Sequence, residues 1–281
     1  MKRKWSLESV RHYLIMMLVS VFVLLPYYWM VTMSLKPASE IMMSPPTLFP
    51  TKIQFDNYIT VWSMLPLFTY MRNSLFVSGV TTIICILSAS LCGYSLSRFS
   101  VHKMQKVTIT MILFAQLIPG FLPMIALYFT IFKMGLTNTY LGLIIAYTMW
   151  GMPFCTLMMR SYFTTAIPIS LEESAKIDGC SRIGIFIRIA MPLALPGLVG
   201  TAIFSFILAW NEFVWASIIL SDGALKPLSV GVYDFVGQYG ANANVALTVT
   251  TGVIITLPVV LVFAFLQKYL VSGLTAGAVK G

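Results

Sequence analysis

Six long apolar stretches alternate with shorter polar segments along this chain. They cover residues 13–35, 73–96, 107–132, 139–162, 197–220 and 247–270. Each is close to the roughly 20 residues that a helix needs to cross the hydrocarbon core of a bilayer. The first stretch is too long for a signal peptide and has no small-residue cleavage site after it, so we interpret it as a retained anchor. The pattern predicts an all-α membrane protein with six transmembrane helices.

The basic residues of the connecting segments predict the orientation of these helices. With the N-terminus inside, 13 Lys and Arg residues fall in cytoplasmic segments and five in external ones. An excess of positive charge marks the cytoplasmic side, so both termini are expected there. This gives a cytoplasmic N-terminus at 1–12, a transmembrane domain at 13–270 with a cytoplasmic loop at 163–196, and a cytoplasmic tail at 271–281.

Composition agrees with this class and excludes others. The chain has 10% charged and 58% apolar residues, whereas soluble domains have about 25% charged residues. Its net charge of +9 fits cytoplasmic loops that fix the topology. Lys and Arg do not form a stripe interleaved with aromatic residues, so we expect no nucleic-acid partner.

The sequence offers no recognisable chemistry for catalysis or metal binding. The four cysteines form no Cys-x-x-Cys pair, and the two histidines lie far apart, so neither a disulfide nor a metal site is predicted. A phosphate-binding Gly-x-x-x-x-Gly-Lys-Ser/Thr loop is missing, as is a nucleophile paired with a base. We therefore expect a chain without a cofactor of its own that is not itself an enzyme, so that any ATP hydrolysis takes place in a partner.

Glu212 is the only acid within a predicted span. A charge there costs at least about 2–3 kcal/mol unless it is paired or hydrated, so Glu212 should face the interior of the bundle or a cavity. Three interpretations stay open: a structural hydrogen bond with Asn211, a substrate-path or gate site with Trp210 and Asn211, and the proton site of a secondary transporter. Arg98, at the inner end of a span, is expected to extend its charge to the interface.

The polar stretch at 170–192 predicts two short helices at the membrane surface. Ser170 and Glu173 have the spacing of a capping box that starts the first helix. That helix should run to about Asp178 and end at Gly179, because glycine readily adopts the left-handed conformation that ends helices. Ser181 can cap the second helix.

The second helix is predicted to present one narrow apolar face. Its apolar positions recur at i, i+3, i+4 and i+7, which is the helical spacing. They are Ile183, Phe186, Ile187 and Ala190. Pro192 then separates the helix from the fifth span, and the result is a helix–glycine–helix hook with carboxylates that point outward.

The same residues carry a resemblance to a known family. Glu173-Ser174-Ala175 is followed after three residues by Gly179 and after nine more by Ile189-Ala190-Met191-Pro192. This spacing resembles that of the Glu-Ala-Ala loop of ABC importer permeases. Ser174 and Met191 depart from the family's alanine and leucine, and both changes leave the helix intact.

Further motifs make the chain similar to the sugar branch of these importers, and to its smaller six-helix permease of maltose type, from about residue 53 to the end. They are Asn57-Tyr58, Asn73-Ser74, the segment Tyr94 to Phe99, the segment Trp210 to Phe213, and the tail Gly273 to Gly281.

The resemblance implies a role for the hook and for the tail. In such importers the loop docks in a cleft of a cytoplasmic ATPase, so Glu173 would contact a basic residue there and Gly179 would supply the turn. The implied coupling residues are Ser170, Glu173, Ala175, Asp178, Gly179, Phe186, Ile189 and Pro192. By the same resemblance the tail residues Gly277, Lys280 and Gly281 reach into the ATPase dimer interface; the alternative is a frayed terminus.

The implied assembly lies in the cytoplasmic membrane of a prokaryote. This chain would pair with a second, different permease and with an ATPase dimer that binds ATP and Mg. An extracytoplasmic sugar-binding protein would meet the external loops 36–72 and 221–246; the alternative is that the loop at 221–246 is only a flexible connection. This protein would deliver a carbohydrate, an oligosaccharide by this interpretation, for transport by alternating access. The competing hypotheses are a proton-coupled secondary transporter that uses Glu212 and a structural or signalling membrane subunit.

Overall fold

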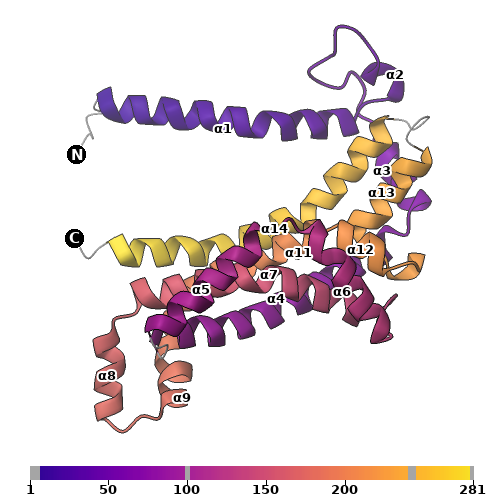
Figure 1. Cartoon of the computed structure of the whole chain (residues 1–281). Helices are drawn as coiled ribbons and strands as arrows, with labels where there is room; N and C mark the ends of the chain where they lie inside the picture. Colours follow the sequence, from indigo (N-terminus) through magenta and orange to yellow (C-terminus); the bar gives the residue numbers. More distant parts are fainter. Residues whose placement is uncertain (1–6, 99–101, 240–244, 279–281) are drawn as a thin grey trace. The chain divides into compact units, whose positions relative to one another are not determined.

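The computed structural model describes residues 7–98, 102–239 and 245–278, and within them all regular secondary structure is helical (Figure 1). The helices are α1 Leu7–Ser34, α2 Ala38–Ile41, α3 Asp56–Met64, α4 Leu67–Arg98, α5 His102–Leu117, α6 Phe121–Lys133, α7 Tyr140–Ala166, α8 Ile169–Ile177, α9 Arg182–Ile185, the π-helical turn η1 Phe186–Ala190, α10 Met191–Leu193, α11 Leu195–Asn211, α12 Val214–Ile219, the 3₁₀ turn η2 Gly223–Leu225, α13 Leu228–Tyr239 and α14 Val245–Ala278. The predicted all-α class is confirmed for this part of the chain.

Among the residues that the structure describes, four helices are long and apolar enough to cross a membrane. They are Glu8–Ser34, Leu67–Arg98, Tyr140–Ala166 and Val245–Phe265. Two bent helix pairs raise the number of candidate spans to six if each pair counts as one span. The chain is therefore a multi-pass membrane protein, while a count of six and the cytoplasmic position of both termini stay predictions.

Two predicted spans are not continuous helices. The third breaks between Leu117 and Phe121, around Pro119, because proline lacks a backbone donor and disfavours helical geometry at the residue before it. The fifth was predicted as one helix over 197–220, which is wrong: α11 ends at Asn211, and α12 begins at Val214.

The chain forms two compact units. One comprises residues 1–66 and 232–258, and the other comprises residues 67–231 and 259–281.

In the first unit, the segment after α1 buries two charged side chains. Lys36 donates to the carbonyl of Thr47 and lies 5.0 Å from the ring centroid of Trp29. Glu40 accepts hydrogen bonds from the hydroxyls of Thr47 and Thr51 and from the Thr51 amide. A buried charge is tolerated when its hydrogen-bonding capacity is met, and these bonds shape the segment between α1 and α3.

Acid is expected to loosen this segment. The hydrogen bonds from Thr47 and Thr51 lower the pKa of Glu40. A lowered pKa in the folded state contributes stability that is fully present above the unfolded pKa, and this stability is lost as the pH falls through the folded pKa. Hydrogen exchange should show a smaller protection factor for the Thr51 amide at pH 3 than at pH 7. Protection that does not depend on pH, or that Glu40→Gln does not alter at pH 7, would contradict this prediction.

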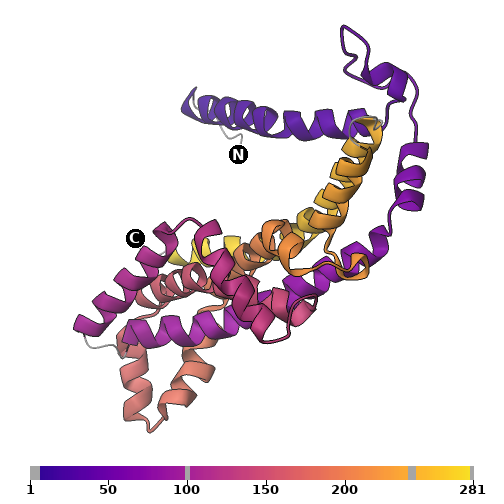
Figure 2. The ribbon, with the colours of Figure 1, turned by 45° about the vertical axis from the view of Figure 1, so that its right-hand side comes forward.

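The second unit is built on α4 and α7, with α11 packed against both (Figure 2). Gly93 lets α4 approach α7 closely, because a Cβ atom there would lie 2.7 Å from the backbone nitrogen of Arg160. Cys85, Ala89, Cys155 and Met159 fill the interface near this point. Beyond the ends of α4 and α7, the chain makes the hook of α8 and α9.

Candidate functional site

In the structure the hook covers residues 168–194, slightly more than the predicted stretch 170–192. It turns at Gly179, as predicted. Helix α8 ends with Asp178 as its C-cap, and Gly179 has a φ of +83°, in the left-handed region. The amide of Cys180 donates to the carbonyl of Ala175 at 3.0 Å, and the amide of Gly179 donates to that of Lys176 at 3.1 Å. These bonds satisfy carbonyls at the end of α8 that have no partner within the helix.

The second arm of the hook begins at the predicted residue. The hydroxyl of Ser181 accepts from the amide of Gly184 at 3.1 Å, which is an N-cap. The π-helical turn and α10 follow, and the chain then bends by 74° into α11.

The predicted capping box at Ser170 is wrong. Pro168 is the N-cap residue of α8, which begins at Ile169 and has no side-chain cap. Proline in extended geometry sets the start two residues earlier than expected, so Ser170 already lies inside the helix. The carbonyl of Ser170 accepts a hydrogen bond from the hydroxyl of Ser174 at 3.0 Å. The side chain of Glu173 does not cap the start of the helix.

The apolar residues of the hook divide between its surface and its interior. Ile177 is 86% exposed and Ile183 is 73% exposed, on either side of the Gly179 turn. Ile187 is exposed as well, whereas Ala190 is fully buried. The single face predicted for the second helix is therefore wrong. The i, i+4 pair Ile183 and Ile187 forms an exposed stripe, and the adjoining pair Phe186 and Ala190 packs inward.

The residues predicted to couple to an ATPase divide in the same way. Exposed ones are Ser170, Glu173, Asp178, Gly179 and Pro192; buried or partly buried ones are Ala175, Phe186 and Ile189. A role in coupling stays a prediction for all of them.

The two adjacent carboxylates of α8 have different surroundings. Glu173 is exposed, whereas Glu172 is buried and its Oε1 lies 2.9 Å from Nε of Arg98. The hydroxyl of Tyr94 donates to the other Glu172 oxygen at 2.9 Å. The expectation that Arg98 extends to the interface is wrong, since its side chain is 6% exposed and ion-paired. Sequence reasoning missed this cluster, although Tyr94 and Arg98 both belong to a quoted motif and lie four residues apart, on one helix face.

The tail can be followed only in part. The backbone of α14 is helical through Gly277 to Ala278. Lys280 and Gly281 lie outside the described residues, so contact of the tail with an ATPase stays a prediction.

Glu212 occupies the break in the fifth span. Its carboxylate accepts from the amides of Trp215 at 2.9 Å and Ala216 at 3.2 Å, and so serves the first turn of α12. Its own carbonyl accepts from the hydroxyl of Ser229 at 2.7 Å. Asn211 instead donates to the carbonyl of Ile207. The predicted hydrogen bond between Asn211 and Glu212 is thus replaced by a helix cap, and a place for Trp210, Asn211 and Glu212 in a substrate path stays a prediction.

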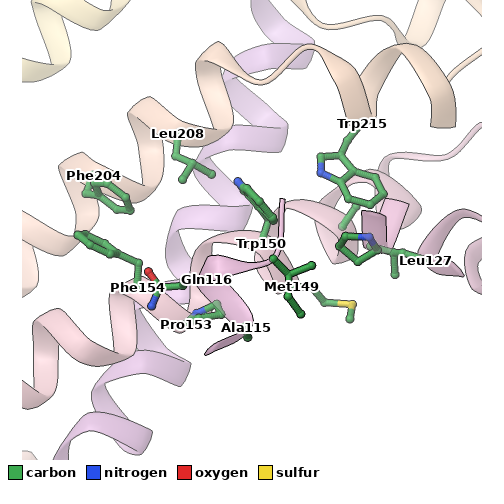
Figure 3. A pocket seen from close by; sticks show the side chains of 13 residues that line it. Ala115, Gln116, Leu127, Met149, Trp150, Pro153, Phe154, Phe204, Leu208 and Trp215 are labelled. Carbon is green, nitrogen blue, oxygen red and sulfur yellow. The ribbon is translucent and has the colours of Figure 1, made fainter. Parts of the chain in front are cut away.

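A cavity of about 400 Å³ lies between α5, α6, α7, α11 and α12 (Figure 3). Its walls are mostly aromatic and aliphatic, and Gln116 supplies an amide. The lining residues named in the figure are Ala115, Gln116, Leu127, Met149, Trp150, Pro153, Phe154, Phe204, Leu208 and Trp215. The rings of Phe154 and Phe204 lie 4.4 Å apart between centroids. None of Trp210, Asn211 and Glu212 lines this cavity.

These features define a class of protein. The described residues form a multi-pass helical protein with no cluster of His, Cys, Asp or Glu that could hold a metal ion. An aromatic cavity lies among the membrane helices, and an exposed hook extends from their ends. This is the construction of a membrane permease with an exposed cytoplasmic or external loop structure at the ends of its helices.

Residues 86–276 match the family of binding-protein-dependent transport system inner membrane components. The chain belongs to this family, and the resemblance to ABC importer permeases of the sugar branch is confirmed. It is 33% identical to the diacetylchitobiose uptake system permease protein of Streptomyces coelicolor over 256 residues, which is 91% of each chain. It is 34% identical to the trehalose/maltose transport system permease protein of Thermococcus litoralis over 266 residues, which is 94% of each chain.

Solved structures have the same fold. A chain of a bacterial ABC transporter involved in the import of the acidic polysaccharide alginate matches with a TM-score of 0.75 at 24% identity, over 96% of this chain and 98% of that one. A chain of the bacterial alginate ABC transporter in complex with alginate pentasaccharide-bound periplasmic protein matches with a TM-score of 0.64 at 16% identity, over 94% of this chain and 96% of that one.

Proposed function

We propose that this chain is one of two permease subunits of an ATP-driven importer that moves a carbohydrate, an oligosaccharide in our interpretation, across the cytoplasmic membrane of a prokaryote. The hook at 168–194 would dock in a cleft of a cytoplasmic ATPase. Closure of the ATPase on ATP and Mg would then move the hook and switch the spans between inward- and outward-facing states.

One observation carries this proposal: the exposed apolar tip of the hook. Ile177 and Ile183 are largely exposed on either side of Gly179, while Glu173 and Asp178 add exposed carboxylates beside them. A small apolar centre with a charged rim is typical of a protein interface. A cleft with apolar walls and a basic residue at its edge would complement this tip.

The carbohydrate cargo is supported by two observations. The named relatives include uptake systems for diacetylchitobiose and for trehalose or maltose. The cavity in this chain has the composition of a sugar-binding surface, because the C–H faces of a sugar ring pack on aromatic rings such as Trp150 and Phe154. An amide such as that of Gln116 can bond sugar hydroxyls.

The partners follow from the same proposal. This chain offers no phosphate-binding loop, so an ATPase dimer would bind the nucleotide and the metal ion. A second, different permease would complete the translocation path. An extracytoplasmic binding protein would deliver the sugar, as in the alginate system whose structure includes a sugar-loaded periplasmic protein.

Co-purification tests the assembly. The tagged chain, solubilised in a mild detergent, should bring down an ATPase and a second permease that mass spectrometry identifies. Proteoliposomes of this complex should take up a labelled oligosaccharide only with ATP inside and the binding protein outside. Purification of the chain alone, or uptake without ATP, would contradict the proposal.

The geometry of Glu212 does not favour the proton-coupled alternative, because its carboxylate oxygens already accept hydrogen bonds from two backbone amides of α12. We expect Glu212→Gln to keep uptake within about twofold of wild type, because glutamine still accepts one of these two hydrogen bonds. An uncoupler should leave uptake unchanged as long as the ATP concentration is maintained. Loss of uptake in both tests would instead indicate a proton site.

A further inference from the structure

One guanidinium links three helices at the base of the hook. Arg98 is the last residue of α4, and its Nε donates to Glu172 of α8 at 2.9 Å. The same side chain donates through Nη2 to the carbonyls of Phe163 at 2.9 Å and Ile167 at 2.8 Å, at the end of α7. Carbonyls in the last turn of a helix have no partner within it and attract a cation. Arg98 therefore fixes the ends of α4 and α7 and the start of α8 at one point.

Tyr94 closes this cluster and extends it to the other arm of the hook. Its hydroxyl donates to Glu172, so both carboxylate oxygens are used. Its ring lies 5.3 Å from that of Phe163 on α7 and 4.9 Å from that of Phe186 in the π-helical turn. We call Tyr94, Arg98 and Glu172 the latch; through it and Phe186, both arms of the hook are held against the membrane helices.

The latch leaves little freedom for relative movement. The side chains of Arg98 and Glu172 are 6% and 11% exposed. Separation of a buried ion pair is strongly disfavoured, because it leaves the remaining charge buried without a partner. The close approach of α4 and α7 at Gly93 adds a steric constraint about one and a half turns before Arg98. Displacement of the hook must then carry the ends of α4 and α7 with it.

We propose that the latch transmits movement of the ATPase to the spans, so that Glu172 and Arg98 are positioning residues for coupling while the neighbouring Glu173 faces the ATPase. This proposal rests on the proposed function, and it adds the element inside the permease that connects docking to transport. Arginine is required because its planar fork reaches Glu172 and the α7 carbonyls together, whereas lysine presents a single point charge.

The first test compares the two adjacent carboxylates in the assembled transporter. Glu172→Gln and Arg98→Lys should still assemble with the ATPase, and their uptake per ATP hydrolysed should fall about fivefold or more at saturating ATPase. Glu173→Gln should act differently, by raising the ATPase concentration needed for half-maximal uptake. A latch that served stability alone would lower the yield of complex and leave uptake per ATP unchanged, and this result would overturn the proposal.

A second measurement needs no ATPase and so separates failure of the latch from failure of the proposed function. Hydrogen exchange on the full chain in detergent should be faster over residues 174–178 in Arg98→Lys and Tyr94→Phe than in wild type, while Glu173→Gln keeps the wild-type rate. Unchanged exchange in both latch variants would overturn the proposal. If exchange rises in them but wild type binds no ATPase, the latch holds the hook, and the inference that it transmits movement is overturned together with the proposed function.

Discussion

Replacement of Gly179 by valine is expected to reduce ATP-dependent uptake by about tenfold or more while the chain still inserts in the membrane. The backbone here has a φ of +83°, and a non-glycine residue pays about 1–2 kcal/mol for left-handed geometry, with β-branched residues the least tolerant. A Cβ atom at this position meets nothing within 4 Å, so the effect would come from the backbone alone. Valine should therefore change the angle between α8 and α9, and with it the position of Ile177 relative to Ile183. Uptake by proteoliposomes at matched protein levels measures the loss.

Gly179→Asn is the matched control, because asparagine adopts left-handed geometry more readily than valine does. We expect it to keep most of the uptake. An equal loss of uptake in the asparagine and valine variants would mean that uptake depends on the absence of a side chain at residue 179 and not on the left-handed turn. Wild-type uptake in the valine variant would remove the turn from the coupling mechanism.

The second large effect is expected at the tip. Ile177→Asp should weaken binding of the ATPase by about thirtyfold, since an apolar anchor at the centre of an interface commonly contributes about 2 kcal/mol or more. Ile177 is 86% exposed in the free chain, so the substitution should leave the fold of the permease unchanged. Titration of the purified permease in nanodiscs with the ATPase gives the change in affinity.

Ile177→Met tests whether apolar character at the tip is sufficient. It conserves volume and should bind the ATPase almost as well as wild type. An aspartate variant that binds as tightly as the methionine variant would show that the ATPase docks elsewhere on the permease.

The shape of the hook was largely predictable because local chemistry determines it. Glycine at 179 ends a helix, and serine at 181 starts one, and both preferences come from the residue's own backbone and side-chain chemistry. The start of α8 was mispredicted for a local reason too, since two residues compete for it. Ser170 offers a cap, but Pro168 already imposes extended geometry at the N-cap position.

The latch was not predictable from this one sequence. Glu172 and Glu173 are adjacent on a helix, and no local signal decides which of them faces inward. Glu172 faces inward because it pairs with Arg98, which lies 74 residues earlier in the chain and is positioned only once α4 and α7 have packed. Glu212 is a similar case, because its amide partners at Trp215 and Ala216 exist only after the fifth span breaks.

The latch has a consequence for how such transporters diversify. Because Glu172 orients the hook from inside the permease, the exposed residues around Ile177 can vary without any compensating change in the membrane helices. If the hook docks on an ATPase as proposed, adoption of a different ATPase would require only a few surface substitutions. By the same reasoning, a single ATPase could then serve several permeases with different cargoes, provided that each presents the same tip.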